Sequence, residues 1–336
     1  MEKKYLEKMI MKIKKPFNTP IIKINGMLGI THFYIKDEST NPTHTFKDRL
    51  SFHLIKQFVK DIEKNKKNYF GCISYGNTAY SLGYYCNEIN KLYNKEICEA
   101  IVFVPSKLKE KTLGPDTDGK YVKAISMLKE ISRYCKIIKI DIDKKFYTDN
   151  DLLEKAKCRF PEIEIFKNIS EGLEYPVYDE LFIESVDDLK TVPDYIIVPF
   201  GAGILCNEII DYINDRKLKT KVIPVSTGNP NSIALMLYGP YWVDTKSLLQ
   251  YGKGETLYNK IDKKGRLREP YYVYNIQEED ILDSLIELKK LQISSEPSAA
   301  AGFAMVKNIK NIYSKFDPKK DVVLVINTGN GLLNFK

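Results

Sequence analysis

The sequence predicts an α/β protein with largely parallel sheets and helices packed against them. Short apolar segments, typical of buried strands, alternate along the chain with amphipathic helical patterns, and this alternation favours right-handed βαβ units. A chain of 336 residues is long enough for two domains with substantial cores. Its 43% hydrophobic and 29% charged residues are typical of a soluble globular protein.

The N-terminal region predicts a short helix, two strands near 20–24 and 32–35, and then a helix that begins near a lysine. Asn41-Pro42 is a turn-forming pair that disfavours helix before the proline. Apolar residues follow at helical spacing from Leu50 to Ile62. These features place Lys47 in the first turn of a helix.

Lys47 is therefore the first candidate for chemistry. A helix N-terminus carries partial positive charge, which lowers the pKa of a lysine placed there. A lysine of lowered pKa can be a nucleophile or form a Schiff base. The alternative, a surface lysine at a helix start, is favoured by this stretch when it is taken alone.

A second candidate lies where a short strand at 70–74 meets a long helical pattern. The connection is Tyr75-Gly76-Asn77-Thr78. Gly76 permits a tight turn, and Asn77 or Thr78 can cap the helix. Exposed backbone N–H groups at such a terminus can also hold an anion, so both interpretations stay open.

The rest of the chain continues the alternation, with two stretches that predict no regular element. Lys107–Gly119 has the composition of a surface loop, and 226–275 is assigned nothing. Strands are predicted near 100–105, 136–140, 163–166, 194–199, 222–225 and 321–327, and helices near 122–131, 152–157, 177–186, 205–213, 280–290 and 304–312.

A third candidate is the glycine loop Phe200-Gly201-Ala202-Gly203, which joins a strand to a helix. This layout suits a phosphate, because backbone N–H groups and the helix dipole both favour a dianion. A dinucleotide site would place an acidic residue after the next strand. That strand is followed instead by Ser226-Thr-Gly, which disfavours NAD.

The last strand ends in a fourth candidate, Thr328-Gly-Asn-Gly331. A turn at a strand end is compatible with the same residues. Upstream, Glu296 either lines the same site or caps the helix that follows it, and the sequence leaves these two roles even.

These segments resemble, in the same order, the motifs of threonine synthases, which are fold type II enzymes that use pyridoxal phosphate (PLP). Asn41–Arg49 resembles Asn-Pro-Thr-Gly-Ser-Phe-Lys-Asp-Arg, with His44 in place of Gly and Thr45 in place of Ser. The other three segments resemble the Ser-Ser-Gly-Asn-Thr loop, the phosphate loop and the C-terminal Thr-Gly-His/Asn-Gly of the family. The resemblance extends from Asn18 to Gly331, with a gap at 226–275.

The resemblance implies the roles of the candidate residues. Lys47 would form the Schiff base and, once freed, remove the α-proton of the substrate. The cofactor would be bound by Lys47, Asn77, Gly201, Ala202, Gly203, Ile204, Leu205 and Thr328. The substrate would be bound by Ser74, Tyr75, Gly76, Asn77, Thr78 and His44.

Departures from the family motifs concern the substrate more than the cofactor. Ala202, Ile204 and Leu205 depart from the phosphate loop, whose donors are backbone groups. Tyr75 replaces a small residue and narrows the expected pocket. His44 is an additional acid or base, a phosphate ligand or a packing substitution.

The resemblance also implies a division into domains and a reaction. Residues 1–55 with 170–336 would form a large domain that binds the PLP phosphate, and 56–169 a small one that carries the Ser-Tyr-Gly-Asn-Thr loop. The activity most similar is that of threonine synthase, which converts O-phosphohomoserine to threonine and phosphate. The alternatives are a threonine or serine ammonia-lyase, another β-replacement synthase, and a non-catalytic relative that binds PLP or an amino acid.

Composition restricts the partners. The net charge of +8 comes from scattered lysines, which favours a small anionic substrate over nucleic acid. The six cysteines show no C-x-x-C pair, as expected for reduced thiols in the cytoplasm. No metal-ligand spacing, signal peptide or membrane span is predicted. A homodimer is compatible with the sequence.

Overall fold

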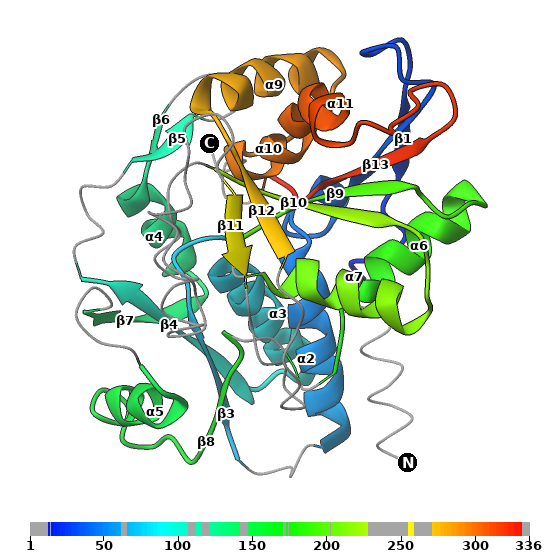
Figure 1. Ribbon diagram of the computed structural model, residues 1–336. Helices are drawn as coiled ribbons and strands as arrows, with labels where there is room; N and C mark the ends of the chain where they lie inside the picture. The colour runs from blue at the N-terminus through cyan, green and yellow to red at the C-terminus, as the bar shows by residue number, and fades with distance from the viewer. Residues whose placement is uncertain are drawn as a thin grey trace.

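The computed structural model describes residues 13, 15–61, 66–106, 112–115, 121–141, 147–170, 173, 175–201, 203–227, 255–258 and 271–330. Two main sheets organise this part of the chain (Figure 1). No helix within it is both long enough and apolar enough to cross a membrane.

The larger sheet has seven strands, and its inner strands are parallel. The edge strands β1 and β11 each run antiparallel to their single neighbour. In spatial order the strands are β1 (Ile21–Ile24), β2 (His32–Asp37), β13 (Val322–Asn327), β9 (Tyr195–Pro199), β10 (Lys221–Thr227), β12 (Tyr271–Ile276) and β11 (Glu255–Tyr258).

The smaller sheet is entirely parallel, which confirms the predicted βαβ arrangement. Its spatial order is β7 (Cys135–Ile140), β4 (Cys98–Pro105), β3 (Asn68–Ile73) and β8 (Ile165–Asn168). A separate two-stranded ribbon pairs β5 (Thr112–Pro115) with β6 (Tyr121–Lys123).

Helices cover both faces of the larger sheet. The helices of the described part of the chain are α2 (Lys47–Asp61), α3 (Asn77–Tyr93), α4 (Ala124–Ile131), α5 (Asp149–Lys157), α6 (Asp179–Leu189), α7 (Ile204–Asp215), α9 (Glu278–Lys290), α10 (Pro297–Met305) and α11 (Ile309–Ile312). Successive side chains of a strand point to opposite faces. Ile196 and Val198 of β9 accordingly join the core that contains α7, whereas Tyr195 and Ile197 join the core beneath α9 and α10.

A single apolar core joins the two sheets. It contains alternate residues of β9 and β13, the inner faces of α2, α3, α6 and α7, and one face of β3 and β4. The opposite face of β3 and β4 packs with α5 in a smaller cluster. Helices α2 and α3 therefore lie between the sheets, and each begins at a segment that the sequence marks as functional.

The structure corrects several predicted elements. Lys107–Gly119 is not entirely loop, because Thr112–Pro115 forms β5. Val122 belongs to β6, and the helix predicted from it begins at Ala124. The strand predicted near 163–166 is displaced to Ile165–Asn168. The region 226–275 also contributes strands β11 and most of β12, which periodicity did not reveal.

Candidate active site

The turn before α2 fixes the position of Lys47. The backbone N–H of Thr43 donates a hydrogen bond to Asp48 Oδ2 over 2.6 Å, and the Thr43 hydroxyl donates to Asp48 Oδ1. Asp48 is fully buried, and burial raises its pKa to about 6. These bonds close the first turn and place Lys47 as the first residue of the helix, as predicted.

The loop after the last strand lies directly against this turn. Thr45 and Gly329 form an antiparallel bridge. The N–H of Phe46 donates to the Thr328 carbonyl and the N–H of Asn330 to the His44 carbonyl, each over 3.0 Å. The fold thus brings Thr328 beside the turn that carries the lysine, although about 280 residues separate them in the sequence.

Gly329 is required by this contact. Its φ of +127° is disfavoured for L side chains, and a Cβ there would lie 2.2 Å from the His44 carbonyl oxygen. Any larger residue would push the two segments apart.

Lys47 has an amine that is easily deprotonated. Its Nζ lies 4.3 Å from the ring centroid of Phe46 and 5.5 Å from that of Tyr178. Burial lowers its pKa to about 8, against the opposing charges of Glu208 and Glu296. Burial, rather than the predicted helix dipole, is thus the main cause. Within the described residues no carboxylate forms an ion pair with this amine.

Helix α7 brings the glycine loop to the same region. Its residue Glu208 interacts electrostatically with Lys47 and accepts hydrogen bonds from the N–H groups of Val177 and Tyr178, over 2.8 and 2.6 Å. Tyr178 is the residue whose ring faces the Lys47 amine. The start of α7 and the amine therefore share one neighbourhood.

The glycine loop leaves the start of α7 open. The helix begins at Ile204, and no side chain caps it. Gly203 precedes it with a φ of +81°, and a Cβ there would lie 3.0 Å from the Phe200 ring. Gly201 is exposed and Leu205 is buried, whereas Ala202 lies outside the described residues.

The loop at 74–78 reaches the site through Asn77. Helix α3 begins at Asn77 with Gly76 before it and has no side-chain cap, so the predicted capping by Asn77 or Thr78 is wrong. The Asn77 amide instead donates to both carboxylate oxygens of Glu296, over 3.1 and 2.9 Å. Glu296 does not cap α10 either, which favours the site-lining role over the capping role.

The other predicted substrate-binding residues differ in how far they are buried. Ser74 is buried, and its hydroxyl accepts a hydrogen bond from the Gly76 N–H. Tyr75 is partly buried, and burial raises its pKa. His44 is exposed, with Nδ1 2.9 Å from the Ser39 carbonyl oxygen. Its φ of +61° lies in the left-handed region that favours glycine, the residue of the threonine synthase motif at this position.

A buried charge network beneath α2 was not predicted. Arg49 donates to both oxygens of Glu38, each over 2.8 Å, and to both oxygens of Glu184, over 2.9 and 2.8 Å. Lys36 adds an ion pair with Glu184 at 3.1 Å. A sequence signal was present, since Arg49 ends the lysine motif and Lys36-Asp-Glu38 stands just before it, but Glu184 could not be assigned to them.

The residues present fit a pyridoxal phosphate group. The Lys47 amine suits its aldehyde, and the uncapped start of α7 behind Gly203 suits its phosphate. Thr328 is only 4% exposed, and its hydroxyl has no hydrogen-bond partner among the described residues. That hydroxyl is suited to a ring nitrogen.

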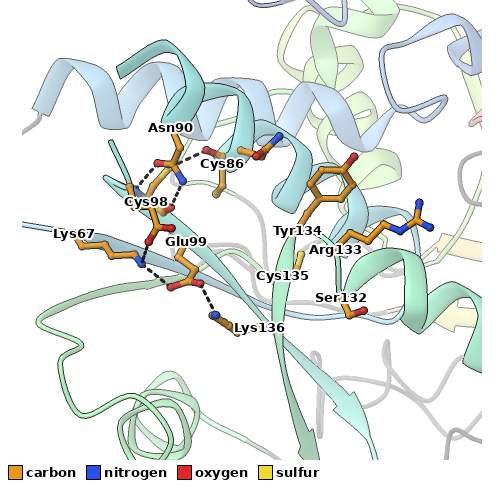
Figure 2. A pocket seen from close by; sticks show the side chains of 12 residues that line it. Lys67, Cys86, Asn90, Cys98, Glu99, Ser132, Arg133, Tyr134, Cys135 and Lys136 are labelled. Atoms are coloured by element: carbon orange, nitrogen blue, oxygen red, sulfur yellow. Dashed lines mark hydrogen bonds and ion pairs between the residues drawn. The ribbon is translucent and has the colours of Figure 1, made fainter. Parts of the chain in front are cut away.

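A cavity of about 190 Å³ lies elsewhere, against the far part of α3 and strands β4 and β7 (Figure 2). Its lining includes Lys67, Glu99 and Arg133, and none of the predicted site residues. The described residues also contain no cluster of His, Cys, Asp or Glu that could hold a metal ion.

Comparison with known proteins agrees with this geometry. The family model described as "Pyridoxal-phosphate dependent enzyme" matches residues 14–329. A threonine synthase of Methanocaldococcus jannaschii is 22% identical over 94% of this chain and 74% of its own length.

Two solved structures share the fold. A pyridoxal 5'-phosphate-dependent aspartate racemase has a TM-score of 0.63 at 17% identity, covering 98% of this chain and 95% of its own. The processed threonine deaminase isoform 2 of Solanum lycopersicum has a TM-score of 0.61 at 14% identity, covering 99% and 90%.

Proposed function

The chain belongs to the family of pyridoxal-phosphate dependent enzymes, and from this premise we propose that it is a lyase or synthase for a small anionic amino acid. Pyridoxal 5'-phosphate is its cofactor, and its fold is fold type II. The proposed reaction begins with removal of the α-proton and continues with elimination or replacement at the β or γ carbon. The specific proposal is the threonine synthase reaction, from O-phosphohomoserine to threonine and phosphate.

One observation carries this proposal, namely the state of the Lys47 amine. It lies in the first turn of α2, has a pKa lowered to about 8, and has no ion-pair partner among the described residues. Near neutral pH such an amine is available both as a nucleophile and as a base. The 22% identity to a threonine synthase supports the specific reaction.

Each candidate residue has a role in holding the cofactor. Lys47 would bind its aldehyde carbon, the N–H groups of Gly201–Leu205 its phosphate, Asn77 its ring oxygen and Thr328 its ring nitrogen. When bound, the cofactor withdraws electrons from the substrate Cα and so makes the α-proton acidic.

The Lys47 amine is the proposed acceptor of that proton. A primary amine can take a proton only in its neutral form, and a pKa of about 8 leaves a useful neutral fraction at physiological pH. The rings of Phe46 and Tyr178 lie beside Nζ. The substrate carboxylate would be held by N–H groups at the uncapped start of α3.

Thr328 limits the range of reactions. Its hydroxyl is neutral and leaves a pyridine nitrogen largely unprotonated, so the ring is a weaker electron sink than one paired with a carboxylate. This favours elimination and replacement over transamination.

Two measurements on the purified protein test the proposal. The first is the visible absorption spectrum before and after addition of O-phosphohomoserine, where we expect a bound-cofactor band that shifts. The second is product analysis, where we expect threonine and phosphate in equal amounts. A protein that binds no cofactor would overturn the proposal.

An ammonia-lyase is the second candidate, and Tyr75 favours it. Its side chain is partly buried where threonine synthases carry a small residue, which reduces the space for a substrate phosphate. With serine or threonine as substrate the products would be ammonia and a 2-oxo acid. A cofactor absorption band that does not change with O-phosphohomoserine but shifts with serine or threonine would favour the ammonia-lyase.

We also propose the division into a large domain of 1–55 with 170–336 and a small domain of 56–169. It is supported by the sheets, because all strands of the seven-stranded sheet lie in the first set and all strands of the four-stranded sheet in the second. The boundary at 55 falls inside α2. Six free cysteines support a location in the reducing cytoplasm.

A further inference from the structure

Glu296 stands immediately before helix α10, where a carboxylate commonly accepts hydrogen bonds from the backbone N–H groups of its own helix. It makes no such bond. Its two oxygens accept instead from Asn77 Nδ2, which lies 219 positions away in the sequence. The Ser298 hydroxyl donates to Oε1 over 2.8 Å and holds the carboxylate from the other side.

The backbone of the same residue is bonded to the Thr328 loop. The N–H of Glu296 donates to the Gly329 carbonyl over 3.0 Å. Gly329 in turn forms the bridge with Thr45, two residues before Lys47. Glu296 therefore connects the start of α3, the loop after the last strand and the turn that carries the lysine.

This arrangement determines how the Asn77 amide is oriented. An amide has one donor end and one acceptor end, and its last torsion is broad when nothing holds it. A carboxylate accepts and cannot donate when ionised, so it fixes the nitrogen end toward itself. Hydrogen bonds to a charged acceptor are also stronger than those between neutral groups.

We propose that Glu296 is a positioning residue that holds the Asn77 side chain, and with it the start of α3, in the orientation required by the cofactor ring. This inference rests on the proposed function, in which Asn77 contacts the ring oxygen. Glu296 also places a charge near Lys47, but the part of its effect that acts through Asn77 must disappear when Asn77 is removed.

A double-mutant cycle on cofactor affinity tests this dependence. We expect Glu296→Ala and Asn77→Ala each to weaken binding of pyridoxal phosphate about tenfold, the scale of one charge-assisted hydrogen bond. The double variant should bind no more weakly than Asn77→Ala alone. Glu296→Gln keeps one acceptor and the side-chain shape, so it should recover part of the affinity. Glu279→Ala is the control, because it removes an exposed carboxylate at the start of α9 that lies outside this network, and its affinity should change less than about twofold.

Two results of the cycle would overturn the proposal. One is an unchanged affinity in Glu296→Ala. The other is an equal loss on adding Glu296→Ala to the Asn77→Ala background, which would show that the two side chains act independently.

Hydrogen exchange on the cofactor-free protein separates this inference from the proposed function. Backbone amides in the first turn of α3 should exchange faster in Glu296→Ala than in the wild type, and the control Glu279→Ala should resemble the wild type. If the wild type bound no cofactor, the proposed function would fail, but faster exchange in Glu296→Ala would still support the positioning of Asn77 by Glu296. Unchanged exchange in Glu296→Ala would overturn that positioning role.

Discussion

At the scale of single residues, the proposed reactivity of this protein depends on where one amine is placed. Lys47 is only partly exposed, with two aromatic rings beside its amine and the charges of Glu208 and Glu296 acting on it. Burial removes water from the ammonium and lowers the pKa, while Glu208 and Glu296 limit the decrease. The resulting pKa of Lys47 is about 8, compared with an ordinary lysine pKa of 10.5.

This pKa predicts how the cofactor-free protein captures pyridoxal phosphate. Only the neutral amine attacks an aldehyde, so capture should accelerate about tenfold from pH 7 to pH 9 and level off above that. A lysine of ordinary pKa would accelerate about a hundredfold over the same range without levelling off. Stopped-flow absorbance measures the rate. Lys47→Ala should show no capture at any pH.

The second prediction at this scale concerns Gly329. Gly329→Ala should destabilise the protein by about 3–5 kcal/mol, since it combines a disfavoured φ with a close contact to His44. Urea unfolding gives the value. Gly26→Ala is the control, because Gly26 also has a positive φ of +73° but no atom within 4 Å of an added Cβ.

The control should therefore lose only about 1 kcal/mol from backbone strain. Equal losses in the two variants would show that the contact between the Thr328 loop and the turn before Lys47 does not constrain residue 329.

At the scale of elements, the position of α2 depends on charges buried beneath it. Arg49 is fully buried and joins Glu38, next to β2, to Glu184 on α6. Breaking a buried pair leaves an uncompensated charge, which costs far more than losing a surface pair. The network therefore orients the helix that carries Lys47 without contacting the chemistry.

Arg49→Met should lower the free energy of unfolding by about 3–5 kcal/mol, because two buried carboxylates lose their partner. Lys91→Ala, which removes an exposed ion pair with Glu88, should change it by less than about 0.5 kcal/mol. Chemical denaturation compares the two. Similar values for both variants would contradict the structural role given to the network.

At the scale of the whole molecule, the site is assembled from distant parts of the chain. Its contributors are the first turn of α2, the starts of α3 and α7, Glu296 before α10 and the loop after β13. A ligand that bridges them binds only the folded state and should raise its stability.

Saturating pyridoxal phosphate should therefore stabilise the protein by about 2.7 kcal/mol at a concentration 100 times the Kd. Thermal unfolding with and without the cofactor measures this as a rise in Tm. Pyridoxine phosphate has no aldehyde and should raise the Tm less. If the cofactor raised the Tm of Lys47→Ala as much as that of the wild type, Lys47 would not be the residue that binds the cofactor.

Local patterns were sufficient for most of the regular elements. Strands β9 and β13 and helix α7 were predictable because buried strands and amphipathic helices leave periodic patterns. Strands β11 and β12 were not, because each follows a glycine-containing or proline-containing stretch whose composition resembles that of loops. The β5–β6 ribbon was missed because its composition is that of a loop.

The sequence by itself determined the candidate residues of the site: a lysine after an Asn-Pro turn, two glycine-containing connections and a threonine at a strand end. These residues can be found from the sequence because turns and helix starts are determined by residues within a few positions of each other. Only the tertiary structure decided that Glu296 pairs with Asn77, that Arg49 joins Glu38 to Glu184, and that burial lowers the Lys47 pKa. Such contacts join positions far apart in the chain, and the water excluded from them depends on how the two sheets pack around α2 and α3.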